Sequence, residues 1–197
     1  LTDTGYIKRQ SLTSFKTQQY MTKQVIRAIV SDGRVVTEKS TEATELFEQS
    51  RFGSQLKDGR LELSYIEAIY LVEKERLEVA DSKGKFVKHE KLFSKAARKE
   101  KNFWPRYYTF KDIRDRGYII KTALKFGADF RVYDRGVKPG EDHAKWIVYP
   151  VRETEHLTWY EFAAKNRVAH STKKRLLMAI VDEEGDVTYY EVRWVRP

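Results

Sequence analysis

The amino-acid sequence predicts an α/β fold (α+β mixed), in which short mixed sheets are flanked by helices. Short apolar stretches rich in β-branched and aromatic residues, such as 144–151 and 176–181, are typical of strands. Helical patterns that open at capping boxes lie between them. With 197 residues, 41% hydrophobic and 34% charged, the chain is long enough to bury a core of ordinary composition.

The first half of the chain predicts a polar lead-in or linker at 1–23 and a small N-terminal mixed α/β domain at 24–102. Asp58-Gly59 is a hairpin turn signal, and Ser64 with Glu67 forms a capping box. The expected elements are, in order, strands at 24–30 and 34–37, a helix at 41–49, a hairpin at 56–63, a helix at 65–74, a short hairpin at 77–87 and a basic amphipathic helix at 89–101.

The second half predicts a C-terminal domain at 103–197 with a central mixed β-sheet flanked by helices. Phe103-Trp104-Pro105 is expected to break the helical pattern at the domain boundary, because proline lacks the N–H that a helix interior needs. The expected elements are a helix at 107–116 stopped by Gly117, strands at 118–124, 129–133 and 144–151, a helix from the Thr158–Glu161 capping box to about 169, a strand at 176–181, an acidic turn at 182–186 and a last strand at 187–195.

The net charge of +9 points to a polyanionic partner, because cationic side chains bind phosphates and release counterions. The excess is concentrated after residue 87: residues 88–102 hold six Lys and Arg against two Asp and Glu, and residues 103–197 hold eighteen against fourteen. Cysteine is absent, which excludes disulfides and thiolate metal sites. The sequence has no run of about 18 apolar residues that would predict a membrane span. Residues 1–30 also lack the apolar core of a signal peptide, and a cytoplasmic location is expected.

Three residue types near the end of the chain suit metal-free RNA cleavage. Tyr133 ends a predicted strand, His143 is expected to open the next one, and Lys174 follows a predicted helix. A phenol, an imidazole and an ammonium supply a base, an acid and a fixed positive charge, which are the functions that attack by a neighbouring 2′-hydroxyl requires. Taken singly, each has an ordinary structural interpretation, as a packed tyrosine, a polar loop residue and a solvated lysine.

Several separated motifs lie within 103–197. They are Arg114-Asp115-Arg116-Gly117-Tyr118-Ile119-Ile120-Lys121, Lys125-Phe126-Gly127-Ala128-Asp129-Phe130, Trp146-Ile147-Val148, Arg167-Val168-Ala169-His170-Ser171-Thr172-Lys173-Lys174, the strand Leu176–Asp182 and the tail Tyr189–Pro197. With these motifs the chain resembles the archaeal tRNA-splicing endonucleases. Residues 24–102 are similar more loosely, and residues 1–23 find no clear counterpart in the shortest members.

The resemblance implies a catalytic subunit that cuts both exon–intron junctions of precursor tRNA at a bulge–helix–bulge fold. It implies 2′,3′-cyclic phosphate and 5′-hydroxyl ends and no metal or other cofactor. Tyr133 would deprotonate the attacking 2′-hydroxyl, His143 would protonate the leaving 5′-oxygen, and Lys174 would stabilise the charged transition state. Lys174 is preferred to Lys173 because the family motif places its lysine four residues after the position of His170.

The resemblance also implies contacts beyond the three catalytic positions. Arg167 would stack on an extruded bulge nucleotide, and Arg193 or Trp194 would serve similarly. An acidic subunit-contact loop would dock into a basic pocket of a second subunit; its members are Asp182, Glu183, Glu184 and Asp186. The last strand would pair with its mate in a dimer. A two-fold symmetric assembly is implied, as four identical chains, a tandem-fused dimer, or two catalytic and two structural chains.

Three other functions stay open from the sequence. A metal-dependent nuclease would use Asp129 as its first ligand, but His143-Ala144-Lys145 has an imidazole where the next carboxylate should stand, and magnesium prefers oxygen. The sequence contains no His-Glu-x-x-His motif of the kind that would predict a zinc site. A non-catalytic structural subunit would be expected to lack the three catalytic residue types. A general ribonuclease without selectivity for RNA structure is compatible with them.

Overall fold

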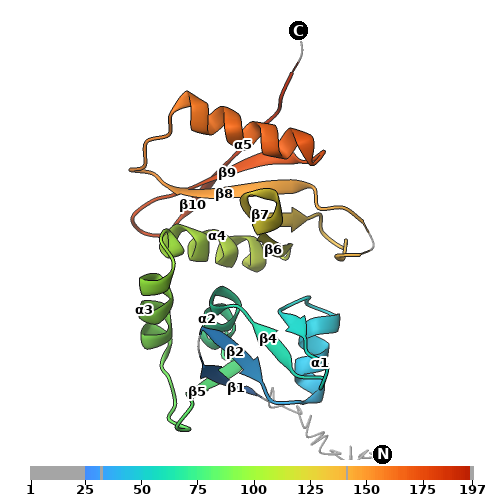
Figure 1. The fold of residues 1–197 in the computed structure, drawn as a ribbon, viewed down its shortest axis with the longest axis vertical. Helices are drawn as coiled ribbons and strands as arrows, with labels where there is room; N and C mark the ends of the chain where they lie inside the picture. The colour runs from blue at the N-terminus through green and yellow to red at the C-terminus, as the bar shows by residue number, and fades with distance from the viewer. Residues whose placement is uncertain (1–24, 32, 141, 196–197) are drawn as a thin grey trace, which may run out of the picture.

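The computed structural model describes residues 25–31, 33–140 and 142–195, which form two five-stranded mixed sheets and five α-helices (Figure 1). The mixed α/β class is therefore confirmed. The expected lead-in at 1–23 lies outside the described residues. Within the described ranges, no helix combines the length and apolarity that crossing a membrane requires.

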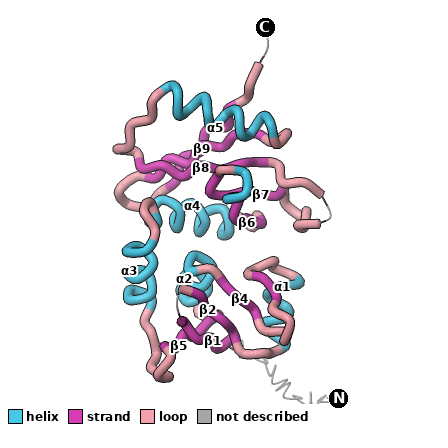
Figure 2. Tube along the Cα trace, in the orientation of Figure 1, coloured by secondary structure: helices cyan, strands magenta, loops and turns pink. Residues whose placement is uncertain are grey.

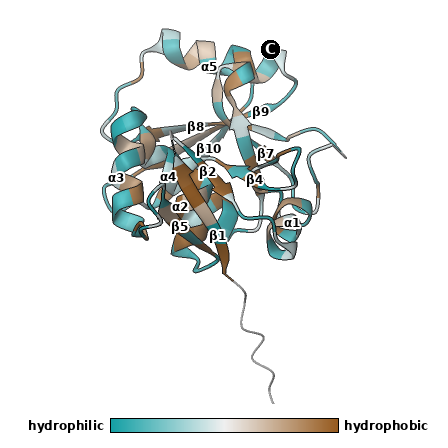
Figure 3. Cartoon of the chain, turned by 60° about the horizontal axis from the view of Figure 1, so that its bottom comes forward, coloured by the Kyte–Doolittle hydropathy of each residue, from teal (hydrophilic) through white to brown (hydrophobic). Residues whose placement is uncertain are grey.

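The first sheet has the strand order β3-β4-β2-β1-β5, in which β1 and β5 are parallel and the other neighbours antiparallel. Its elements are β1 (Ile26–Ser31), β2 (Arg34–Thr37), α1 (Thr41–Glu48), β3 (Ser54–Gln55), β4 (Leu61–Leu63), α2 (Tyr65–Glu73), β5 (Leu77–Asp81) and α3 (His89–Lys99). The Ser64–Glu67 capping box opens α2 as predicted. Most of α2 is buried, and Figure 3 shows apolar ribbon gathered at α2, β1 and β5.

The second sheet has the order β10-β9-β8-β7-β6, with β8 and β9 parallel and the other neighbours antiparallel. Its elements are α4 (Phe103–Asp115), β6 (Ile119–Ala123), a 3₁₀ turn (Leu124–Phe126), β7 (Ala128–Tyr133), β8 (Trp146–Arg152), α5 (Trp159–Ser171), β9 (Arg175–Val181) and β10 (Val187–Val192). Helix α5 is the crossover between the parallel strands. It covers one face of the sheet, and α4 covers the other (Figure 2).

Helix α4 lies between the two sheets and carries the main core. Its Phe103 and Phe110 belong to one buried cluster with Ile69 of α2 and Phe130 of β7. A second cluster, between α5 and the opposite face of the second sheet, includes Ile147, Leu176, Met178 and Ala169. The second sheet is therefore packed on both faces, which gives a rigid support for side chains at its edges.

The start of α4 differs from the sequence prediction, because the helix begins at Phe103 rather than at 107. Asn102 has a left-handed backbone (φ 63°) and separates α3 from α4. Pro105 lies in the first turn of α4, where a helix leaves its N–H groups unpaired, so the proline is tolerated there. Gly117, at φ 83°, ends the helix as predicted.

The expected short hairpin at 77–87 is confirmed, because Ala80 and Phe86 form an antiparallel bridge and the N–H of Val87 donates to the carbonyl of Val79 over 2.8 Å. Two other strands begin or end elsewhere than predicted. Strand β8 begins at Trp146 rather than at 144, so His143 lies in the preceding loop instead of opening the strand. Strand β10 ends at Val192 rather than at 195. Apolar residues lie beyond both strands, with Ala144 before β8 and Trp194 and Val195 after β10. The side-chain pattern alone does not mark where strand pairing stops.

Candidate active site

A pocket of about 370 Å³ lies at the edge of the second sheet where β7 ends and β9 begins. The three residues expected to be catalytic all line it, on segments that are far apart in the sequence. Its lining consists of Phe126, Arg131, Tyr133, Gly140, Asp142, His143, Ala144 and Lys174.

The sheet topology explains why these segments meet. Strand β7 runs antiparallel to β8, and β8 runs parallel to β9, so the end of β7 meets the beginnings of β8 and β9 at one edge. The backbone N–H of Lys145 donates to the carbonyl of Val132 over 2.9 Å, and the N–H of Arg175 donates to the carbonyl of Lys145 over 3.0 Å. Val132 directly precedes Tyr133, Lys145 lies two residues after His143, and Arg175 directly follows Lys174, so these bonds bring the three candidate catalytic residues to one edge.

Tyr133 is the last residue of β7 and is 4% exposed. The guanidinium carbon of Arg131 lies 5.8 Å from the centre of its ring. The Nε of Arg131 is buried and has no hydrogen-bond partner among the described residues. The sequence interpretation did not single out Arg131. Its two-residue spacing from Tyr133 could have predicted a place beside that residue, because alternate residues of a strand share a face.

His143 is exposed, in the loop between β7 and β8. Its backbone N–H donates to the carboxylate of Asp142 over 2.6 Å, which is a local contact that holds the loop. The imidazole itself remains open to solvent and lines the pocket.

Lys174 is positioned by the end of α5. The N–H of Lys173 donates to the carbonyl of His170 over 3.0 Å, and the N–H of Lys174 donates to that of Ala169 over 2.9 Å, the two bonds of a Schellman motif. Lys173 takes the left-handed conformation (φ 55°) that this motif requires. The Lys174 ammonium donates to the carbonyl of Thr172 over 2.9 Å, which leaves two further N–H groups to donate.

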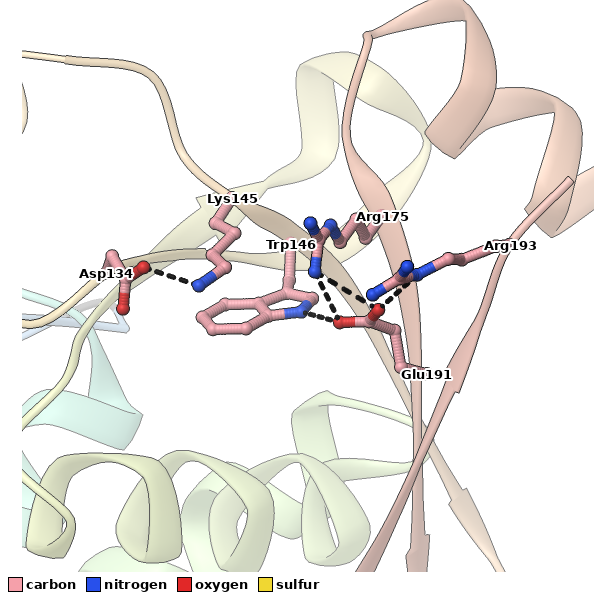
Figure 4. A network of polar contacts seen from close by, with 6 residues as sticks. All are labelled: Asp134, Lys145, Trp146, Arg175, Glu191 and Arg193. Carbon is pink, nitrogen blue, oxygen red and sulfur yellow. Dashed lines mark hydrogen bonds and ion pairs between the residues drawn. The ribbon is translucent and has the colours of Figure 1, made fainter.

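A network of polar side chains supports the same sheet edge (Figure 4). Glu191 of β10 accepts hydrogen bonds from the indole of Trp146 over 2.8 Å and from Arg193 over 2.7 Å, and Arg175 contacts it over 3.3 Å. Lys145 pairs with Asp134, the residue after Tyr133. The network ties together the residues next to Tyr133 and Lys174, and sequence reasoning missed it because its partners are distant in the chain.

The hydrogen bond from Trp146 and the guanidinium groups of Arg193 and Arg175 lower the pKa of Glu191 to about 2, although desolvation acts against them. A folded-state pKa below the ordinary 4.5 stabilises the fold above that value, and this contribution is lost as the pH falls toward 2. We therefore expect Glu191→Gln to lower the free energy of unfolding by about 1 kcal/mol at pH 7, a typical size for partly exposed ion pairs. In denaturant titrations from pH 2 to 7, the difference in free energy of unfolding between wild type and variant should shrink below pH 4.5. A difference that stays constant over that range would contradict the lowered pKa of Glu191.

The expected RNA-contact residues lie outside the pocket lining. Arg167 is exposed on α5, with its guanidinium carbon 6.0 Å from the ring centre of Tyr160. Arg193 follows β10 and pairs with Glu191. Trp194 is 49% exposed and lies 4.7 Å, centre to centre, from the ring of His170.

The acidic loop forms a tight turn between β9 and β10. Asp182 accepts from the backbone of Asp186 over 2.9 Å, and Glu183, Glu184 and Asp186 are exposed. Gly185 has φ 91°, and a Cβ there would lie 2.3 Å from Cε1 of Tyr108 in α4. The turn thus rests directly on α4 and presents its carboxylates outward.

Asp129, the carboxylate considered for a metal site, lies outside the pocket and pairs with Arg106 over 3.0 Å. Burial raises its pKa, although Arg106 opposes that shift. Across the ranges that the structure describes, no group of three His, Cys, Asp or Glu side chains is arranged to hold a metal ion.

The fold and the pocket define a protein with two mixed α/β units and a pocket at a sheet edge that combines phenol, imidazole and cationic groups. The sequence model described as "tRNA intron endonuclease, catalytic C-terminal domain" matches residues 103–189, and that described as "tRNA intron endonuclease, N-terminal domain" matches residues 26–93.

Three relatives agree with these matches. The tRNA-splicing endonuclease of Thermococcus onnurineus is 40% identical over 174 residues, which are 88% of this chain and 99% of the relative. That of Nanoarchaeum equitans is 46% identical over 152 residues, 74% of this chain and 97% of the relative. That of Methanothermobacter thermautotrophicus is 41% identical over 164 residues, 83% and 94% respectively. The chain belongs to the tRNA intron endonuclease family and is an enzyme, which confirms the resemblance drawn from its motifs.

Proposed function

We propose that this enzyme cuts precursor tRNA at both exon–intron junctions of a bulge–helix–bulge, without a metal ion, and leaves 2′,3′-cyclic phosphate and 5′-hydroxyl ends. The observation that carries the proposal is the convergence of Tyr133, His143 and Lys174 on one pocket. The pocket is open at the surface, at a sheet edge held on both faces, which suits a large RNA substrate.

In the proposed reaction, Tyr133 acts as the base that removes the proton of the 2′-hydroxyl preceding the cut. The 2′-oxygen bonds to phosphorus, and the bond from phosphorus to the 5′-oxygen breaks. His143 gives its proton to that leaving oxygen, and Lys174 stabilises the negative charge that builds on the phosphoryl oxygens. Proton transfer at each end adds roughly 10²–10⁴ in rate.

Cations near the phenol support its use as a base, because positive charge stabilises the anion that a phenol becomes when it loses its proton. Arg131 and Lys174 both line the pocket with Tyr133. The guanidinium of Arg131, which lines the pocket, is a type of group suited to binding a phosphate oxygen. We therefore assign Arg131 to binding the scissile phosphate beside the three catalytic groups.

Cleavage assays on two RNAs of equal length test the proposed function, one with a bulge–helix–bulge and one fully paired. We expect cutting of the bulged RNA alone, in excess EDTA, with cyclic phosphate at the new 3′ ends. Loss of activity in EDTA, restored by magnesium, would favour the metal-dependent alternative. Equal cutting of both RNAs would favour a general ribonuclease.

We propose that Arg167, Arg193 and Trp194 contact bulge nucleotides. Arg167 and Trp194 present exposed planar groups suited to stacking. The Arg193 side chain pairs with Glu191 through Nε and remains 64% exposed, so the rest of its guanidinium is open to a nucleotide.

We further propose that the acidic turn binds a second copy of the chain or a related subunit, in a two-fold symmetric assembly. A cavity of about 390 Å³ between the two sheets is lined by Lys74, Arg76, Arg114 and Lys138 and suits carboxylates. Burial lowers the pKa of Arg114 to about 10, and an incoming carboxylate would offset that cost. Strand β10, the end strand of its sheet, is the edge proposed to pair with its mate.

Charge reversal tests the acidic turn. We expect the double change Glu183→Lys and Glu184→Lys to lower the assembled mass measured by light scattering, because like charges would face the basic cavity. Glu78→Lys with Glu90→Lys is the matched control, since both glutamates are exposed and lie in the first half of the chain. An unchanged mass in the first variant would exclude the turn from the assembly.

A further inference from the structure

Two aromatic side chains at the start of α5 are open to solvent. Trp159 is 85% exposed and Tyr160 is 77% exposed, the highest values among the exposed large hydrophobic residues of the described ranges. Trp159 contacts Phe162 edge-on, and Tyr160 contacts Arg167. Adjacent exposed aromatic side chains of this size are typical of a contact surface.

Helix geometry places this pair in line with the candidate active site. Tyr160 and Arg167 are seven residues apart, almost two turns, so they share one face of α5 about 10 Å apart along its axis. The guanidinium carbon of Arg167 is 6.0 Å from the Tyr160 ring centre. Lys174 follows the other end of the same helix. The order along the helix is therefore aromatic ring, guanidinium, and then the ammonium of the pocket.

The positive charge along α5 favours an anionic RNA strand as the ligand of this surface. Arg167 is exposed on the helix and Lys174 follows its end, whereas Lys165 lies over the ring of Tyr149. The single carboxylate of α5, Glu161, is engaged at the helix start, where it accepts from the N–H and the hydroxyl of Thr158, each over 2.8 Å. A surface that continues from the pocket with this charge and an aromatic ring matches the backbone and the bases of RNA.

We propose that Tyr160, with Trp159 beside it, is a stacking site for an unpaired RNA base roughly 20 Å along α5 from the cut phosphate. The proposal rests on the proposed function, because it takes the pocket around Lys174 as the point of cleavage. The base stacks on the ring of Tyr160, and Arg167 contacts the same nucleotide or its neighbour. The site fixes the register of the strand relative to the pocket and adds affinity without taking part in the chemistry.

Binding of an uncut precursor tests the site. The probe is a bulge–helix–bulge RNA with 2′-deoxy nucleotides before both junctions, and its dissociation constant is measured for wild-type, Tyr160→Ala, Tyr160→Phe and Phe86→Ala proteins. We expect Tyr160→Ala to bind about tenfold more weakly. Tyr160→Phe should bind as the wild type does, because the ring is kept. Phe86, 56% exposed in the first half of the chain, is the matched control and should show no change.

An abasic scan of the same RNA identifies the stacked base. One abasic position should weaken binding to the wild type and have no effect on Tyr160→Ala, because both changes remove the same contact. Equal affinity of Tyr160→Ala and wild type would overturn the proposal. So would a fall in assembled mass of Tyr160→Ala without RNA, which would assign the surface to a second copy of the chain.

The two proposals fail in different ways. Cleavage of the 2′-deoxy RNA would contradict the proposed reaction and, with it, a stacking site that is placed relative to the cut. Equal affinities on an intact probe would contradict the stacking site alone. A thermal melt of each variant checks folding, which is expected to persist because both changed side chains are exposed.

Discussion

Replacing His143 with alanine is expected to slow cleavage by roughly 10²–10⁴-fold while the dissociation constant for precursor tRNA stays nearly unchanged. The imidazole is exposed in a loop, so its loss should leave the fold intact. Its proposed role is the proton given to the leaving 5′-oxygen, which is needed in the transition state and not for binding. Single-turnover cleavage and equilibrium binding, measured on the same RNA, separate the two effects.

A changed leaving group makes this test specific. An RNA with sulfur in place of the leaving 5′-oxygen needs no proton donor, because a thiolate is a far better leaving group than an alkoxide. The His143→Ala enzyme should therefore cut the sulfur-containing RNA nearly as fast as the wild type does. His156→Ala is the control, since His156 is exposed and lies outside the pocket. Cleavage of ordinary RNA by His143→Ala at the wild-type rate would eliminate His143 as the acid.

The second large effect is expected at Lys174. Lys174→Ala should lower the single-turnover rate by roughly 10²–10³-fold, the usual cost of removing one donor to a developing oxyanion. The reason is that the ammonium lines the pocket and is held there by the carbonyl of Thr172, with two N–H groups left for the phosphate.

Lys173 offers a matched control one residue away. Lys173→Gly removes the same charge, and glycine accepts the left-handed backbone at φ 55° without strain. Its cleavage rate should stay within a few-fold of wild type, because Lys173 does not line the pocket. If both variants lost activity equally, general positive charge rather than a placed ammonium would account for the loss.

Local signals in the sequence predicted much of the fold. The two capping boxes at Ser64 and Thr158 and the helix stop at Gly117 depend on contacts within a few residues, and the structure contains all three. The start of α4 was predicted too late because a proline in the first turn of a helix was interpreted as a break. The start of β8 was predicted too early, and the loop before it is held by the pairing of Lys145 with Asp134, a contact that the local pattern does not show.

The candidate site could be predicted in its residue types and not in its geometry. Tyr133 and Lys174 meet only because α5 carries the chain across to the strand beside β8, a consequence of sheet order that no spacing shows. Arg131 carries a local signal, since it lies two residues before Tyr133 on the same strand. The hydrogen bonds of Glu191 have no such signal, because Trp146 lies 45 positions away in the sequence.

The central claim is that the RNA supplies its own nucleophile at the pocket formed by Tyr133, His143 and Lys174. A precursor with a single 2′-deoxy nucleotide before one junction tests it most directly, with cleavage at each junction followed separately in EDTA. We expect the substituted junction to stay intact while the other junction is cut. Cleavage at the substituted junction at a normal rate would contradict it, because the attacking oxygen would then have to come from elsewhere.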